Sequence, residues 1–148
     1  MITTLDELKA SAGQHLGYSE WRQIAQQQID AFADAADDHQ WIHVDAPRAV
    51  SGPFGTTIAH GYLTLSLLVP MFSELAGIRD ATMGINYGLN KVRFPAPVLS
   101  GSKIRLGATL AAVNDITGGL EAVVEAVIEI EGTAKPACVA QAVYRYYT

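Results

Sequence analysis

Apolar positions repeat at helical spacing in the first half of the chain and at strand spacing in the second half. Near the N-terminus, Thr4 and Glu7 match a capping box and Gly13 is a stop signal, so we expect a short helix within residues 4–13. A second helix is predicted over residues 26–37, because apolar residues there recur on one helical face: Ile29, Phe32, Ala33 and Ala36.

Residues 60–76 are apolar nearly all the way round a helix. This pattern is typical of a helix buried on most sides, and we expect it at the centre of the fold. Pro70 lies inside the segment and leaves the carbonyl of Ser66 without its usual hydrogen-bond donor, so a kink is predicted.

The second half of the chain alternates apolar and polar residues, which is the pattern of half-buried strands. Four successive antiparallel strands are predicted over residues 83–94, 103–112, 121–130 and 137–147. An earlier strand over residues 18–24, which are rich in aromatic side chains, would complete a five-stranded antiparallel sheet. A long apolar helix and a sheet that needs a cover suit each other, so the predicted class is α+β, with the sheet wrapped around the helix.

The composition indicates a globular protein whose 148 residues form one domain, residues 1–148. A net charge of −5 gives no overall attraction to nucleic acid or to anionic membranes. The longest apolar run, residues 67–72, is far shorter than the roughly 20 residues of a membrane helix, and no signal peptide is apparent. The only cysteine, Cys138, has no disulfide partner, so we expect a cytoplasmic protein in which this thiol packs as a small apolar side chain.

Titratable side chains gather beside apolar sequence in two short segments, residues 38–43 and 59–61. These segments are the first place to look for chemistry. Asp38 stands near the C-terminus of the second predicted helix, where the helix dipole disfavours negative charge. His43 follows five residues later, and on a continuous helix the two side chains would point roughly 140° apart. They converge only if the helix ends near Asp38 and the chain bends back. His39 and His43 have the spacing of some zinc sites, but no glutamate follows His39 and no cysteine is near, so no metal is expected.

Three blocks of sequence, residues 38–45, 52–62 and 91–98, resemble the MaoC-like dehydratases in residue type, order and spacing. These hot-dog-fold proteins include the (R)-specific enoyl-CoA hydratases and the nodulation protein N-like group. The resemblance spans about residues 17–147 and implies a hot-dog fold, a homodimer, and a tunnel for an acyl thioester at or near the subunit interface.

The resemblance also implies a role for individual residues. Asp38 and His43 would activate water for addition to a trans-2-enoyl-CoA, and the backbone N–H of Gly61 would support the thioester oxygen. The chain departs from the family pattern at Gln40-Trp41, where relatives have Asn-Pro. Gln40 still offers an amide, whereas the bulk of Trp41 is expected to affect substrate length and the geometry around the site.

The chemistry of hydration fits these residues independently. It needs a base for water, a proton for the α-carbon and a donor to the enolate-like oxygen. A histidine titrates near pH 6.5, and the N–H of Gly61 at a helix start is free to donate. For His60 we favour a bracing role over direct catalysis. Ser66 either lines the substrate pocket or bonds back to its own helix.

Four basic residues fall within fifteen positions on two strands that we expect to be neighbours: Lys91, Arg93, Lys103 and Arg105. Such a patch would suit the phosphates of coenzyme A, and it would equally protect a sheet edge by charge. The sequence thus predicts an (R)-specific enoyl-CoA hydratase, working reversibly as a 3-hydroxyacyl-CoA dehydratase, without a cofactor. The alternatives are an acyl-CoA thioesterase of the same fold and a non-catalytic acyl-thioester binding module.

Overall fold

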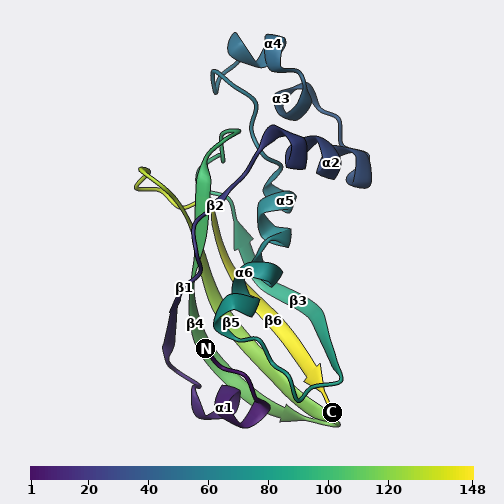
Figure 1. Cartoon of the computed structure of the whole chain (residues 1–148), viewed down its shortest axis with the longest axis vertical. Helices are drawn as coiled ribbons and strands as arrows, with labels where there is room; N and C mark the ends of the chain where they lie inside the picture. The colour runs from purple at the N-terminus through teal and green to yellow at the C-terminus, as the bar shows by residue number, and fades with distance from the viewer.

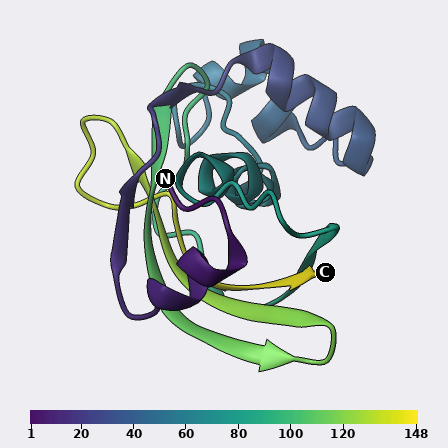
Figure 2. The same cartoon turned by 60° about the horizontal axis from the view of Figure 1, so that its bottom comes forward.

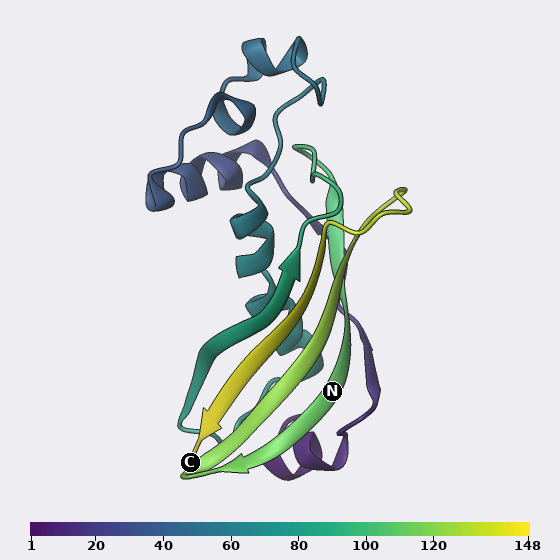
Figure 3. The same cartoon turned by 180° about the vertical axis from the view of Figure 1, so that it is seen from behind.

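The computed structural model describes all residues from 1 to 148 and has two parts, a curved sheet around a helical axis and a cap of short helices (Figure 1). Seen nearly along the axis, the sheet curves around helices α5 (Gly61–Ser66) and α6 (Leu68–Leu75) (Figure 2). The cap lies at one end of the molecule, beyond the sheet (Figures 1 and 3). It is formed by α2 (Gln26–Ala36), α3 (Trp41–Val44) and α4 (Ala46–Val50). The predicted α+β class and the wrapped helix are confirmed.

The four long strands are β3 (Met83–Arg93), β4 (Lys103–Ile116), β5 (Gly119–Ile130) and β6 (Cys138–Tyr147), and all their pairings are antiparallel. The order across the sheet is β1-β4-β5-β6-β3, in which β1 is the short strand His15–Tyr18. The expectation that consecutive strands are neighbours is therefore wrong for β3 and β4, which lie on opposite sides of β5 and β6. Local periodicity marks a strand but does not choose its partner.

The early strand is broken into two pieces, β1 (His15–Tyr18) and β2 (Arg22–Gln23), and both pair with β4. It therefore begins earlier than the predicted residues 18–24 and is interrupted between the pieces. At the interruption, Ser19 exchanges two hydrogen bonds with Leu106: its N–H donates to the carbonyl, and its hydroxyl accepts from the N–H. The hydroxyl of Ser19 thus takes the place of a backbone carbonyl in the hydrogen-bond ladder, and the chain departs from regular strand geometry there.

The two helices predicted in the N-terminal region are confirmed with small shifts of their ends. Helix α1 (Leu5–Ala10) has the expected capping box between Thr4 and Glu7, and α2 spans Gln26–Ala36. Helix α1 ends before Gly13, because the chain turns there and Gly13 adopts a positive φ of 85°. No helix in the structure is both long and apolar enough to cross a membrane.

The central helix is two helices, α5 (Gly61–Ser66) and α6 (Leu68–Leu75), that meet at Leu67. The break falls one turn before Pro70, where the proline ring displaces the carbonyl of the residue four positions earlier. The pair is also less buried than predicted, since the side chains of Tyr62 and Val69 are 73% and 41% exposed. The opposite side of the pair enters the core through Leu63, Leu67, Leu68, Met71 and Phe72.

Two short cap helices were not predicted, α3 (Trp41–Val44) and α4 (Ala46–Val50). The side chain of Asp45 accepts a hydrogen bond from the N–H of Arg48, and Pro47 stands in the first turn of α4. A capping aspartate followed by a proline is a helix-start signal that the sequence does contain. Cys138, the first residue of β6, is fully buried as expected.

Candidate active site

The end of α2 turns the chain so that Asp38 faces back toward α3. Asp37 adopts a left-handed conformation with φ of 55°, which aspartate tolerates better than most residues. The N–H of Asp38 then donates to the carbonyl of Ala33 at 3.0 Å and closes the helix end. The bend that Asp38 and His43 require is therefore present.

His43 is carried by α3 and is only 6% exposed. Its Nδ1 lies 2.7 Å from the carbonyl oxygen of Ile58. Because a carbonyl only accepts hydrogen bonds, Nδ1 carries the proton and Nε2 keeps a lone pair. The N–H of Ile58 in turn donates to the carbonyl of Ile42 at 2.9 Å, so the segment before α5 is fastened to α3. His43 is thus held in the tautomer of a base.

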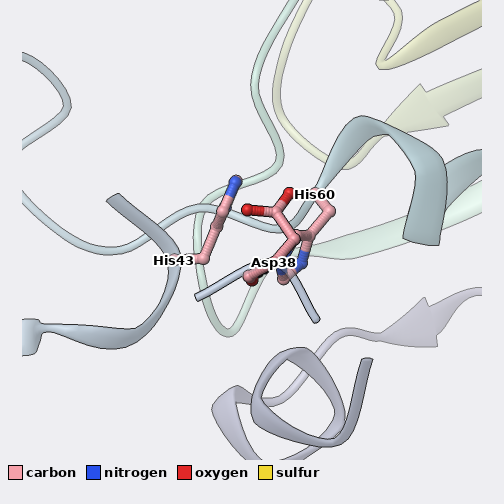
Figure 4. Close-up of side chains that lie close together, drawn as sticks. All are labelled: Asp38, His43 and His60. Carbon is pink, nitrogen blue, oxygen red and sulfur yellow. Dashed lines mark hydrogen bonds between the residues drawn. The ribbon is translucent and has the colours of Figure 1, made fainter. Parts of the chain in front are cut away.

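Asp38, His43 and His60 form one cluster, with a polar side-chain atom of each within 4.8 Å of those of the other two. Figure 4 shows the Asp38 carboxylate beside the two imidazole rings. One water molecule making hydrogen bonds of about 2.8 Å spans such a separation. The cluster can therefore hold a water between the carboxylate and an imidazole nitrogen.

His60 packs closely against the other two members of this cluster. It is 3% exposed, its Nε2 donates to the backbone carbonyl of Asp38 at 2.9 Å, and its Nδ1 has no partner in the protein. Its ring stacks on His43 with centroids 3.8 Å apart and planes at 22°, and Phe32 packs against it at 4.9 Å. Stacked rings direct their in-plane lone pairs side by side rather than at a common point. The arrangement therefore favours proton transfer at His43 over metal binding by both rings.

The pKa of His43 is lowered, chiefly because burial disfavours the charged ring. The neighbouring His60 also lowers the pKa, while the hydrogen bond to Ile58 and the charge of Asp38 oppose the shift. Hydrogen bonding to Asp34, at 2.8 Å, instead raises the pKa of the exposed His39. His39 precedes α3, so the helical face that a zinc pair of His39 and His43 would share does not form.

Gly61 begins α5, and no side chain caps this helix. The residue lines a pocket of about 370 Å³ beside the histidine cluster. A Cβ at position 61 would come within 3.2 Å of the Phe94 ring, so only glycine fits there without movement of that ring. The pocket wall is mostly apolar and includes Phe54, Ile58, Ala59, Thr64 and Phe94.

The two residues that depart from the family pattern lie at the start of α3. The side chain of Gln40 is exposed, while its backbone carbonyl accepts from the N–H of His43 at 3.0 Å. The ring of Trp41 lies under the Arg48 guanidinium, 4.3 Å from the ring centroid, and directly against Gly52. Trp41 therefore packs α3 onto α4 and the turn that follows it.

Ser66 both bonds back to its own helix and lines a groove, the two alternatives that the sequence left open. Its hydroxyl donates to the carbonyl of Tyr62 at 2.7 Å, and its side chain lines a groove of about 280 Å³ between the central helices and strands β3 and β6. The groove wall also contains Leu65, Val69, Asn86 and Leu89.

The predicted four-residue basic patch is wrong. Arg105, on β4, forms an ion pair with Glu129 at 2.7 Å and stacks on Tyr18 and Trp21, on the opposite side of the sheet from β3. Lys91 and Arg93 remain exposed on β3, and neither pairs with a carboxylate. The prediction failed because it assumed that β3 and β4 are neighbours.

Sequence reasoning missed two contributors to this site. The backbone carbonyl of Ile58 selects the tautomer of His43, and the ring of Phe94 closes the pocket over Gly61. A backbone carbonyl has no signature in the sequence. Phe94 follows the last residue of β3, and its place opposite Gly61 depends on the sheet order.

The chain is similar to a known family and to curated proteins along most of its length. The family described as MaoC like domain matches residues 7–133. The chain is 51% identical over 141 residues to 3-hydroxyacyl-thioester dehydratase Z of Mycobacterium tuberculosis, covering 95% of this chain and 93% of that protein. It is 48% identical over 141 residues to nodulation protein N of Rhizobium leguminosarum bv. viciae, covering 93% of this chain and 87% of that protein.

Solved structures resemble the fold at low sequence identity. The (R)-hydratase from A. caviae involved in PHA biosynthesis has a TM-score of 0.74 and 22% identity, with 90% of this chain and 94% of that chain covered. A MaoC-like dehydratase from Rhodospirillum rubrum has a TM-score of 0.72 and 17% identity, with 92% of each chain covered. These likenesses confirm the expected hot-dog fold.

Proposed function

The chain belongs to the MaoC-like domain family, and from this premise we propose that it is a hydro-lyase. The reaction is addition of water to a trans-2-enoyl thioester to give the (R)-3-hydroxyacyl thioester, and its reverse. The observation that carries the proposal is the meeting of Asp38 with a neutral, buried His43 beside the Gly61 pocket.

Asp38 and His43 hold one water and share the proton chemistry. The water oxygen bonds to the β-carbon while one of its protons passes to the base, and the base then delivers that proton to the α-carbon on the same face. Nε2 of His43 carries the lone pair for this step, because its Nδ1–H is engaged with Ile58. The addition consumes one water and leaves both catalytic groups as they began.

Gly61 stabilises the negative charge that develops on the thioester oxygen. Its N–H stands at the uncapped start of α5, where the helix dipole is positive, and the residue lines the pocket that receives the acyl group. Loss of one such donor in other enzymes costs about 100- to 1,000-fold in rate. Lys91 and Arg93 are our candidates for contacts with the phosphates of coenzyme A, since no acidic side chain pairs with either.

The direct test incubates the purified protein with trans-2-enoyl-CoA substrates of short, medium and long acyl chains and follows loss of the enoyl absorbance. We expect turnover with at least one length, and an (R) configuration in the product. An absence of turnover with every length would refute the proposal. Release of free thiol from saturated acyl-CoA would instead identify a thioesterase, and binding without either reaction would identify a binding module.

The pH dependence of the reaction tests His43 separately. Burial lowers the pKa of His43, so its lone pair persists to lower pH than that of an ordinary histidine. We expect the acid limb of kcat/KM to fall below pH 6.5, the ordinary histidine value. The measurement is a profile from about pH 5 to about pH 8. A limb that lies above pH 6.5 would contradict a buried neutral base.

We further propose that the protein is a homodimer, joined along the free edge of β3. This strand pairs only with β6, and four large apolar side chains of the strand are exposed: Met83, Ile85, Tyr87 and Leu89. An unpaired, apolar edge is a liability that pairing with a second copy removes, and a two-fold axis pairs the same strand with itself. With its buried lone cysteine, the dimer suits a reducing cytoplasm.

A charge placed on this edge should break the dimer. We expect Ile85→Lys to shift the protein to monomer in sedimentation experiments at low protein concentration, because each copy would bring a charged lysine into the apolar interface. Val127→Lys is the matched control, since Val127 is 39% exposed against 40% for Ile85 but lies on the interior strand β5. An unchanged dimer in Ile85→Lys, or equal dissociation of both variants, would place the interface elsewhere.

A further inference from the structure

Gln26 is the first residue of α2, and both the nitrogen and the oxygen of its side-chain amide make hydrogen bonds. Its Nε2 donates to the backbone carbonyl of His43 at 2.7 Å and to the Asp30 carboxylate at 2.8 Å. Its Oε1 accepts from the Thr57 hydroxyl. A carbonyl and an ionised carboxylate only accept hydrogen bonds, so the orientation of the amide follows from its partners.

The hydrogen bonds of Gln26 belong to a closed ring of contacts that includes His43. Thr57 is followed in the chain by Ile58, whose carbonyl receives the Nδ1–H of His43 at 2.7 Å. Gln26 meanwhile holds the backbone carbonyl of His43 itself. The imidazole ring of His43 is therefore hydrogen-bonded to Ile58, and its backbone carbonyl is hydrogen-bonded to Gln26. Gln26 and Ile58 are themselves connected through Thr57. Thr57 is 2% exposed, so water does not compete for its hydroxyl.

We propose that Gln26 is a positioning residue for the reaction, acting through Thr57 to hold the His43 imidazole in place and in its Nδ1–H tautomer. This inference rests on the proposed function, in which Nε2 of His43 is the base. Without the Gln26 amide, α3 loses its tie to α2 and the ring is free to tilt away from the water shared with Asp38. A displacement of about 1 Å near reacting groups costs about 100-fold in rate.

The first test replaces Gln26 with Met, which keeps the length of the side chain and removes all three hydrogen bonds. We expect kcat to fall about 10- to 100-fold while KM changes less than about twofold, because the pocket at Gly61 is untouched. Gln27→Met is the matched control on the same helix, since Gln27 is exposed and its side chain makes no hydrogen bond. It should retain wild-type kcat.

A second measurement needs no turnover. The ¹H–¹⁵N imidazole spectra, assigned with a His43 variant, should show the Nδ1–H tautomer in the wild-type protein and a mixture in Gln26→Met. Thr57→Val removes the hydroxyl at the other end of the linkage, and its effect on the tautomer should not add to that of Gln26→Met. Thr57→Val also supplies the test if Gln26→Met does not fold.

A wild-type kcat in Gln26→Met, or an unchanged His43 tautomer in both variants, would overturn the inference. Equal losses in Gln26→Met and Gln27→Met would overturn it as well. If the wild-type protein hydrates no enoyl thioester but the tautomer shifts as expected, the positioning by Gln26 stands and the proposed reaction fails.

Discussion

Replacement of Asp38 with Asn is expected to lower kcat for enoyl-CoA hydration by about 100- to 10,000-fold, the range found for loss of a general acid or base. Asn is close to Asp in size, and the backbone carbonyl of residue 38 would still accept from His60. The variant removes only the charge and the proton-accepting oxygen that hold the water opposite His43. Steady-state kinetics with the best enoyl-CoA substrate measure the loss.

Asp37→Asn is the matched control for this variant. Asp37 is the preceding residue, its side chain is 98% exposed, and Asn tolerates its left-handed backbone as well as Asp does. We expect this control to keep wild-type kcat and the same thermal unfolding midpoint. Full activity in Asp38→Asn, or an equal loss in the Asp37 control, would remove Asp38 from the mechanism.

Replacement of His43 with Asn should have a comparable effect, also about 100- to 10,000-fold in kcat. The amide nitrogen of Asn lies near the place of Nδ1, so it can continue to donate to the Ile58 carbonyl that anchors the native ring. Asn has no atom at the position of the His43 Nε2. We therefore expect the fold to persist, as circular dichroism would verify, while the base is lost.

His39→Asn provides the comparison for that measurement, because His39 is exposed and bonded to Asp34 outside α3. It should leave kcat unchanged. Asp38 and His43 act on one water, so the double variant should lose little more than either single variant. Additive losses, or a His43→Asn protein with wild-type activity, would show that the two residues do not act as a unit.

Sequence periodicity was sufficient for elements whose burial follows their own pattern. Helix α2 and strands β4, β5 and β6 each bury one face, so the spacing of their apolar residues reports their geometry. The convergence of Asp38 and His43 was predictable only in part: the resemblance implied it, and the residues showed that it requires a helix end near Asp38, which the left-handed Asp37 supplies.

Features that depend on distant partners were not predictable in this way. The position of β3 beside β6 follows from the packing of the whole sheet, and it invalidated the expected basic patch. Trp41 illustrates the same limit at the site: its ring packs against Arg48 and Gly52, and nothing in the sequence indicated either contact. The stacking of His60 on His43 joins residues seventeen positions apart, and no local pattern encodes it.

The placement of the cap has a consequence for how the protein fails on heating. Asp38 and His43 lie at the end of α2 and on α3, beyond the ends of the strands (Figure 1). The cap is joined to the segment before α5 by hydrogen bonds to Ile58 and Thr57. Local opening of this cap leaves the long strand pairings intact. Thermal inactivation can therefore precede thermal unfolding, and ligands that bridge α3 and the Gly61 pocket would protect activity more than they raise the melting temperature.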